Sequence, residues 1–263
     1  MTRSRGRLLG LLWPPVVFGA AFLVIWETAV NVFDFQPYFL PAPSAILDAF
    51  RSNTELIWEA TKVSGLNALI GLVLGTAIGV GMAFLLARFR LADDLMSPLA
   101  VALNAVPIFV LVAVFNNMYP VTSEVPRRLM ATLVVYFIVL INVARGLREV
   151  GSVYLDLMRS YAASDVTVLR KVRVPHAVPY LFIALKIAAP ASVITAFVSE
   201  YFGGLQNGLG SRIVSNIALS NNAEAWAYVL GACLLGLAFF LTAAALERVA
   251  TPGGVGARER DGA

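Results

Sequence analysis

Six apolar stretches, separated by more polar segments, set the pattern of the chain. They cover residues 8–33, 63–87, 98–115, 129–144, 178–198 and 226–246. A helix needs about 20 apolar residues to cross a bilayer core of about 30 Å. The third and fourth stretches are the weakest, because Pro107 interrupts one and the other is short. Strands of a membrane barrel would alternate in blocks of about ten residues, and these stretches do not. The pattern therefore predicts an all-α membrane protein with six transmembrane helices.

The most informative polar segment lies between the fourth and fifth stretches, at residues 151–175. Ser164 can cap a helix, so we predict two short helices with a break near Ala163. Pro175 is expected to end them, because the residue before a proline avoids the helical region. A basic, amphipathic pair of this kind either lies on anionic lipid or contacts a soluble partner. Its apolar residues recur at helical steps of three to four, at Met158, Tyr161, Ala162, Val166, Leu169 and Val172.

Composition and charge support a membrane protein with both termini in the cytoplasm. The chain is 59% hydrophobic and 14% charged, with a mean hydropathy of +0.78, whereas soluble domains carry about 25% charged residues. With the N-terminus inside, fourteen Lys and Arg residues fall in cytoplasmic segments and five in external ones. The positive-inside rule favours that orientation. The first stretch is too long for a secretory signal, and the net charge of +4 needs no nucleic acid to explain it.

We expect a single transmembrane domain over residues 1–250, followed by a cytoplasmic tail. The tail, residues 251–263, is rich in glycine and charge, which predicts disorder. In the second stretch, Gly71, Gly75 and Gly79 form a stripe that allows close approach of another helix, either within the chain or in a dimer. Cys233 is the single cysteine, so the chain has no disulfide framework.

Polar residues and a proline inside the apolar stretches are candidates for a transport pathway or gate, since polar groups are costly at membrane depth. Each also has a structural explanation. Lys186 can extend to the inner face or pair there, the asparagines can hydrogen-bond between helices, and Glu200 can brace the loop 201–222. Pro107 would kink the third helix and free a carbonyl group. The candidates are Asn104, Pro107, Asn142, Lys186, Ser199 and Glu200.

The segment from Met158 to Pro175, followed by Ala177-Val178-Pro179-Tyr180, resembles the "EAA" loop of permease subunits of bacterial type I ABC importers. It looks most like the branch that carries nitrate, sulfonates and taurine. Ala162 stands where that family usually has glycine, and a backbone φ above zero there would cost energy for alanine. The segment also departs from the family pattern at Asp156-Leu157-Met158, where Glu-Ala-Ala is usual.

The resemblance extends over nearly the whole chain, because further motifs of the family occur in the family's order. They are Trp26-Glu27, Phe39-Leu40-Pro41-Ala42-Pro43-Ser44, Ser97-Pro98-Leu99, Ala105-Val106-Pro107, Ser199-Glu200-Tyr201-Phe202-Gly203 and Gly208-Leu209-Gly210. This resemblance implies the type I importer permease fold, in the bacterial cytoplasmic membrane. It also implies two ATPase subunits, a second permease copy or paralogue, and an extracytoplasmic solute-binding protein.

In that family the loop seats in a cleft of the ATPase subunit. The resemblance therefore implies ATPase coupling through Arg159, Ser160, Tyr161, Ala162, Ala163, Ser164, Asp165 and Val166. The chain itself has no Gly-x-x-x-x-Gly-Lys-Ser/Thr phosphate loop and no cluster with metal-ligand spacing, while its lone His176 suits a structural role. We expect a transport subunit without a cofactor of its own, with ATP and Mg bound by the partner ATPase.

Two matters stay open at this stage. The alternative function is that of an autonomous secondary transporter or another multi-span membrane protein. A secondary transporter would show broken half-helices in two repeated halves. No convincing repeat is present, and such a protein would leave the segment 151–175 without a role. The solute is also open, because the sequence shows no clear anion site. Nitrate, a sulfonate, taurine and a vitamin or pyrimidine-type precursor are all candidates.

Overall fold

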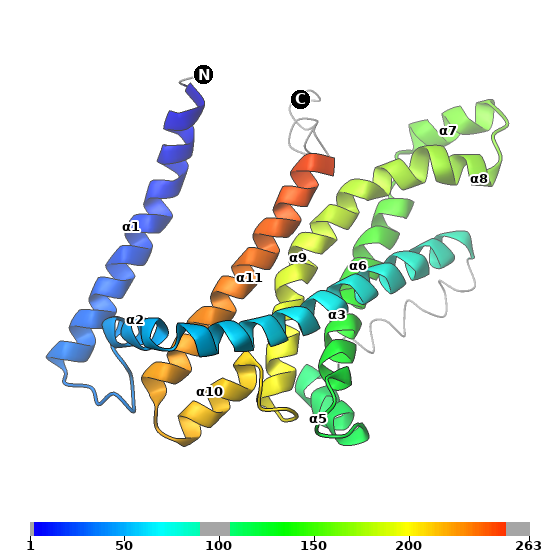
Figure 1. Cartoon of the computed structure of the whole chain (residues 1–263). Helices are drawn as coiled ribbons and strands as arrows, with labels where there is room; N and C mark the ends of the chain where they lie inside the picture. The colour runs from blue at the N-terminus through cyan, green and yellow to red at the C-terminus, as the bar shows by residue number, and fades with distance from the viewer. Residues whose placement is uncertain (1–2, 90–105, 251–263) are drawn as a thin grey trace.

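The computed structural model describes residues 3–89 and 106–250 (Figure 1), and every regular element in these ranges is a helix. This confirms the predicted all-α fold. The elements are α1 (Arg3–Val32), α2 (Pro43–Ser52), α3 (Thr54–Arg88), α5 (Ile108–Met118), α6 (Val125–Arg148), α7 (Ser152–Ser160), α8 (Asp165–Val168), a π-helical turn η1 (Leu169–Arg173), α9 (Val174–Tyr201), α10 (Leu209–Ala218) and α11 (Asn222–Ala250).

Five helical segments within the described ranges are long and apolar enough to cross a membrane: Trp13–Val32, Thr54–Arg88, Val125–Arg148, Asp165–Tyr201 and Asn222–Ala250. They correspond to five of the six predicted spans. The predicted third span is represented by α5, which has 11 residues, while residues 98–105 lie outside the described ranges. Pro107 precedes α5 as its N-cap residue, so α5 itself does not run through it. Proline fits there because the start of a helix needs no donor from it. A kink at Pro107 would need a helix before it, which lies outside the described ranges, so the kink stays a prediction.

The long helices pack through small residues on α3. A methyl group added at Gly71 would lie 2.3 Å from the Ala131 side chain, and one at Gly75 would lie 2.6 Å from the Thr132 carbonyl oxygen. Gly79 approaches α6 in the same way. The predicted stripe is therefore used within the chain, against α6. This contact continues into an apolar core between α3, α6 and α9, formed by Ala83, Leu86, Val135, Val139, Leu140, Val143, Leu147, Ala184 and Ala188.

Two groups of helical segments lie at opposite ends of the molecule. Figure 1 shows the start of α1, the end of α11 and the α7–α8 pair at one end, with α2, α5 and α10 at the other. α1 stands apart from the bundle in Figure 1, and only 6% of its most apolar part is buried. Its side-chain contacts with the rest of the chain include Trp26, whose ring lies 5.5 Å from that of Trp226.

A contact between α1 and the first turn of α2 holds these two helices together. Ser44 lies in the first turn of α2, whose N-cap residue is Ala42. Glu27 of α1 accepts hydrogen bonds from the backbone nitrogen and the hydroxyl group of Ser44, at 3.0 and 2.7 Å. A carboxylate near a helix N-terminus is favourable, so the residue that stabilises the start of α2 comes from α1.

Candidate functional site

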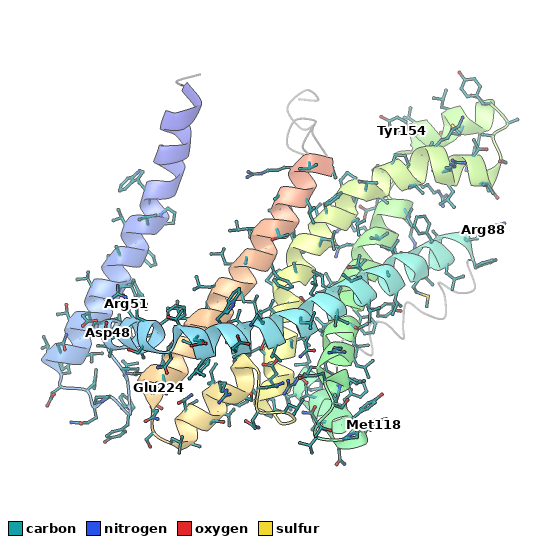
Figure 2. All side chains as sticks on the ribbon, viewed as in Figure 1. Asp48, Arg51, Arg88, Met118, Tyr154 and Glu224 are labelled. Atoms are coloured by element: carbon teal, nitrogen blue, oxygen red, sulfur yellow. The ribbon has the colours of Figure 1, made fainter. Side chains whose placement is uncertain are left out.

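The α7–α8 pair projects from the bundle and forms an exposed surface. No residue of α7 is buried, and the exposed fractions are 76% for Val153, 74% for Tyr161 and 65% for Val166. Figure 2 shows Tyr154 on this projecting pair, and the end of α3 at Arg88 below it. Arg88, Asp165 and Arg173 line a small hollow between the end of α3 and the pair. The projecting surface is thus apolar at several positions and charged at its base.

The turn between α7 and α8 is held by local backbone hydrogen bonds. Ala163 N donates to Met158 O at 3.0 Å, and Ala162 N donates to Arg159 O at 2.9 Å. These are the two bonds of a Schellman motif, whose key residue adopts a left-handed conformation and is usually glycine. Here it is Ala162, with φ of 47°. This is the position where the sequence has alanine in place of the usual glycine, so the turn is kept at a cost of about 1–2 kcal/mol.

The second helix of the pair begins as predicted. Ser164 is the N-cap residue of α8, and its hydroxyl group accepts a hydrogen bond from Thr167 N at 3.4 Å. The predicted break near Ala163 is also confirmed, because α7 ends at Ser160 and α8 begins at Asp165. The side chain of Arg159 pairs with Asp156 in the same helix, at 3.0 Å. The polar groups of the turn therefore bind one another, and much of the apolar surface stays free.

The prediction that Pro175 ends this segment is wrong. The chain continues from α8 through η1 directly into α9, and the helical run Asp165–Tyr201 has 37 residues. In η1 the backbone hydrogen bonds span five residues, whereas those of an α-helix span four. Val174 N donates to Leu169 O. A π turn shifts the hydrogen-bond register, and Pro175 then falls in the first turn of α9, where a missing N–H costs little.

The base of the pair is fixed to the end of α6. His176 Nδ1–H donates to the Gly146 carbonyl oxygen at 2.7 Å, and the rings of His176 and Tyr180 lie 5.5 Å apart. A methyl group at Gly146 would lie 2.8 Å from the Tyr180 ring, so glycine is required for this contact. His176 has the structural contact expected of it, and it anchors the first turn of α9.

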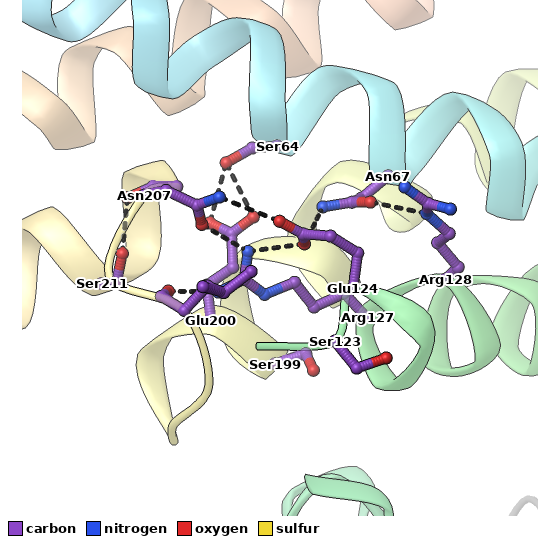
Figure 3. A network of polar contacts seen from close by, with 12 residues as sticks. Ser64, Asn67, Ser123, Glu124, Arg127, Arg128, Ser199, Glu200, Asn207 and Ser211 are labelled. Carbon is purple, nitrogen blue, oxygen red and sulfur yellow. Dashed lines mark hydrogen bonds and ion pairs between the residues drawn. The ribbon is translucent and has the colours of Figure 1, made fainter. Parts of the chain in front are cut away.

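A buried polar network occupies the opposite end of the bundle (Figure 3). Its central cation, Arg127 at the start of α6, is 1% exposed. Its Nη1 lies 2.7 Å from Glu124 Oε2 and 2.8 Å from Asn207 Oδ1, and its Nη2 donates to the Leu205 carbonyl oxygen. Asn67 of α3 donates to Glu124 at 2.8 Å. The network thereby ties α3 and α6 to the loop between α9 and α10.

Glu124 lies just before α6 and is the acceptor at the centre of this network. Burial raises the pKa of its carboxyl group, but the hydrogen bond from Asn207, the charge of Arg127 and the hydrogen bond from Asn67 lower it by more. The net pKa is below the ordinary value of 4.5. The ionised form of Glu124 is therefore favoured by the folded structure.

Glu200, a candidate gate residue, forms a second part of the network with α3 and α10. Its carboxylate oxygens lie 2.7 and 2.9 Å from the hydroxyl oxygen of Ser64, which donates to them. Gly210 N also donates to Glu200, at 3.0 Å. The side chain is 1% exposed. Glu200 thus braces the region after α9, which was the structural alternative considered for it.

The other candidate pathway residues are scattered through the bundle. Lys186 forms an ion pair with Glu247 of α11 at 2.8 Å. Asn142 donates to Ile138 O of its own helix at 2.8 Å. Ser199 is fully buried, and its hydroxyl group has no hydrogen-bond partner among the described residues. Asn104 lies outside the described ranges. A cavity of about 450 Å³ between α3, α9 and α11 is lined by apolar residues such as Leu72, Val73 and Phe239, and none of the candidates within the described ranges lines it.

Several residues of the network were not among the candidates that the sequence indicated. Glu124 and Arg127 carried a usable signal, since they stand at helical spacing just before an apolar stretch. By charge alone, Arg127 is one of the five Lys and Arg residues of the external segments. Ser64 and Asn207 carried no signal of their own, because a single serine or asparagine is common and does not by itself indicate a buried network. Among the described residues no three His, Cys, Asp or Glu side chains lie together in a way that could hold a metal ion.

Comparison with known families decides what this arrangement belongs to. Residues 75–253 match the family described as the binding-protein-dependent transport system inner membrane component. A probable ABC transporter permease protein of Haemophilus influenzae is 32% identical over 207 residues, which cover 77% of this chain and 82% of that protein. The chain belongs to this permease family. It is a permease subunit of an ABC importer.

The permease is also similar to a second curated protein and, in fold, to a solved structure. The formylaminopyrimidine transport permease protein ThiX of Halalkalibacterium halodurans is 26% identical over 241 residues, covering 90% of this chain and 94% of that protein. A chain of the inward-facing MetNI methionine ABC transporter is similar in structure, with a TM-score of 0.56 and 18% identity over 74% of this chain and 94% of that chain. At this identity the likeness shows the fold, which is that of a type I ABC importer permease.

Proposed function

We propose that the permease docks a separate ATPase subunit on the α7–α8 pair and passes the movement of that subunit into the bundle through α9. One observation carries this proposal. The exposed pair, with Tyr161 and Val166 facing outward, is continuous in backbone with a helix that runs to the opposite end of the bundle. The coupling surface comprises Arg159, Ser160, Tyr161, Ala162, Ala163, Ser164, Asp165 and Val166.

Cross-linking tests the docking surface directly. In a Cys233→Ala background, which removes the single cysteine, a Tyr161→Cys variant is expected to cross-link to the co-expressed ATPase. A Leu219→Cys variant is the matched control, since Leu219 is similarly exposed, at 70%, but lies at the end of α10. Cross-linking of both variants, or of the control alone, would contradict the assignment.

The permease is proposed to act as one of two permease subunits, identical or paralogous, with two ATPase subunits. ATP and Mg are bound by the ATPase, and the permease has no ATPase site of its own. The weakly buried α1 and the family membership support a larger assembly, because one bundle of this size offers little enclosure for a pathway. Native mass measurement is expected to give two permeases and two ATPases. A stable, active complex with one permease would refute this stoichiometry.

The permease is proposed to lie in the bacterial cytoplasmic membrane with both termini in the cytoplasm. The start of α1, the end of α11 and the α7–α8 pair lie at one end of the molecule (Figure 1), which agrees with the distribution of Lys and Arg. A solute-binding protein would then approach the other end, near α2 and α10. Protease applied to inside-out vesicles is expected to remove tags from both termini, and protection of both would refute this topology.

The proposed solute is a small neutral heterocycle of the pyrimidine type. Arg127, Arg128 and Lys186 each bind an acceptor within the chain, so these cations are not available to an anion such as nitrate or a sulfonate. The ThiX relative is named as a formylaminopyrimidine permease and matches over most of its length. With the cognate binding protein, a formylaminopyrimidine is expected to stimulate the ATPase, whereas taurine and nitrate are not. Stimulation by taurine or nitrate alone would reverse the choice.

Among the candidate gate residues, we assign solute contact to Ser199 first. A fully buried hydroxyl group without a partner is costly, and Asn116 of α5 donates to the Ser199 carbonyl oxygen at 3.4 Å, so polar groups of two helices meet here. Ser199→Ala is expected to raise the KM for uptake with little change in stability. An unchanged KM would leave Asn104, Pro107 and Asn142 as the candidates for the pathway. Lys186 and Glu200 would keep their structural roles, in the ion pair with Glu247 and in the hydrogen bonds to α3 and α10.

A further inference from the structure

The helix α10 has no cap of its own. Its N-cap residue, Gly208, has no side chain to offer, and the first amide groups of a helix have no partner within it. Two residues from other helices serve them instead. Gly210 N donates to Glu200 of α9 at 3.0 Å, and Leu209 N donates to the Ser64 hydroxyl group of α3 at 2.9 Å. Ser64 in turn donates to Glu200, so the cap is one connected unit.

The surfaces that form this cap fit closely. A methyl group added at Gly208 would lie 2.2 Å from the Glu200 carboxyl group, and one at Gly210 would lie 2.3 Å from the Phe197 carbonyl oxygen. Ser64, Glu200 and Leu209 are each no more than 1% exposed. α10 therefore cannot slide along α9 without breaking buried hydrogen bonds, which is costly because the separated groups stay out of water.

The position of Glu200 along α9 gives this cap a mechanical consequence. The helical run from Asp165 to Tyr201 has 37 residues and is about 55 Å long at 1.5 Å per residue. The exposed pair lies at its start, and Glu200 lies in its last turn. We infer that Glu200 is a positioning residue that fixes α10 to α9, so that α10 at the outer end follows the movement of the helices that contact the ATPase.

α10 also packs on α11, and that contact differs in kind. Ile213 of α10 belongs to an apolar cluster with Ala227 and Tyr228 of α11. Apolar contacts are non-directional, so they tolerate small rotations and shifts of one helix on another. The hydrogen bonds to Glu200 and Ser64 are directional. The cap therefore decides which neighbour α10 follows. This inference rests on the proposed coupling role of the α7–α8 pair.

The variants that test it differ in one group each. Glu200→Ala removes the acceptor, and Glu200→Gln keeps an oxygen of the same reach, so the glutamine variant is expected to restore function. Ser64→Ala removes the linking hydroxyl group. Its matched control is Ser192→Ala, which deletes an equally buried hydroxyl group whose hydrogen bond goes to Ala189 O of its own helix.

The first measurement compares ATPase activity in the assembled transporter. Glu200→Ala and Ser64→Ala are expected to keep the ATPase attached and the basal rate unchanged, while stimulation by the loaded binding protein falls about fivefold or more, in the range of coupling between sites. Glu200→Gln and Ser192→Ala are expected to retain stimulation. Normal stimulation in both Glu200→Ala and Ser64→Ala would overturn the inference. Loss of the ATPase from the wild-type complex would instead overturn the proposed function.

The second measurement follows α10 itself. Spin labels are placed on α9 and α10 at the exposed residues Ile194 and Ile217, in the Cys233→Ala background. In the wild type the distance between the labels is expected to stay narrow and unchanged when ATP is trapped. In Ser64→Ala it is expected to broaden or shift with ATP, and in Ser192→Ala it is expected to remain as in the wild type. A wild-type distance that changes with ATP would show that α10 does not follow α9.

Discussion

Two acid–arginine pairs of the same spacing lie at opposite ends of this permease. Glu124 and Arg127 lie 2.7 Å apart, and their side chains are 20% and 1% exposed. Asp156 and Arg159 lie 3.0 Å apart, and their side chains are 64% and 79% exposed. Both pairs join residues three apart at a helix end. The two pairs share the spacing of an acidic residue and an arginine. The first pair is buried and connects helices, whereas the second lies on an exposed surface.

The difference extends to the residues around each pair. At the buried pair, polar groups from α3, α6 and the loop before α10 satisfy one another inside the bundle. Around the exposed pair, Tyr161 and Val166 point outward while nearby polar groups are bound locally. Burying charge and exposing apolar surface are both costly for a chain alone. The buried charge is compensated by hydrogen bonds within the chain. The exposed apolar surface is compensated by nothing within the described residues, which favours a partner that covers it.

The largest expected effect is on stability, from removing the two arginines in parallel. Arg127→Ala is expected to lower the free energy of unfolding by about 3–5 kcal/mol, because it leaves buried acceptors without their cation. Arg159→Ala is expected to change it by less than about 1 kcal/mol, since an exposed pair contributes little. Thermal unfolding of the purified complex in detergent measures both. Equal effects of the two variants would show that burial does not distinguish these pairs.

The second effect is on function, at the exposed end. Ala163→Trp places a bulky side chain in the turn proposed to enter the ATPase cleft. Expression and membrane insertion are expected to stay near wild type, because the turn lies outside the core. ATP hydrolysis stimulated by solute is expected to fall about fivefold or more, because the side chain blocks the contact.

Val249→Trp is the control for this variant. Val249 is 80% exposed and lies at the same end of the molecule, near the end of α11 (Figure 1), but it is not part of the helix pair. It is expected to leave stimulated hydrolysis unchanged. If the pair lies only on lipid, Ala163→Trp will also leave it unchanged, and normal uptake with the ATPase attached would remove the coupling role.

A smaller effect is expected from titrating the buried pair. The folded pKa of Glu124 lies below 4.5, so its contribution to stability is present above pH 4.5 and is lost as the pH falls through the folded pKa. The melting temperature of the wild type is therefore expected to fall more steeply below pH 4.5 than that of Glu124→Gln. Parallel curves for the two proteins would show that Glu124 does not carry this dependence.

The smallest effect is expected in the turn of the exposed pair. Ala162 has φ of 47°, a conformation that glycine adopts without strain. Ala162→Gly is expected to raise the free energy of unfolding by less than about 1 kcal/mol, because glycine also gains freedom in the unfolded chain. A small rise in the melting temperature, with coupling retained, is the expected result. A clear loss of stability would show that the turn has another source of strain.

The amino-acid sequence by itself was sufficient to predict the features that depend on neighbouring residues. The apolar stretches predicted helices, because a helix in lipid must satisfy its backbone internally. Ser164 predicted the start of α8, and its cap involves Thr167 only three residues away. Gly71, Gly75 and Gly79 predicted a close helix contact, although the choice of α6 as the partner came from the structure.

Only the tertiary structure decided the features that depend on distant residues. Glu200 caps α10 together with Ser64, which lies 136 positions away in the chain, and Glu27 serves the start of α2 from α1. Neither partner can be read from local spacing. The prediction at Pro175 was wrong for a related reason, because packing of His176 against Gly146 accompanies a π turn that carries the helix past the proline. Local rules describe a segment alone, whereas the fold determines which groups must satisfy each other once water is excluded.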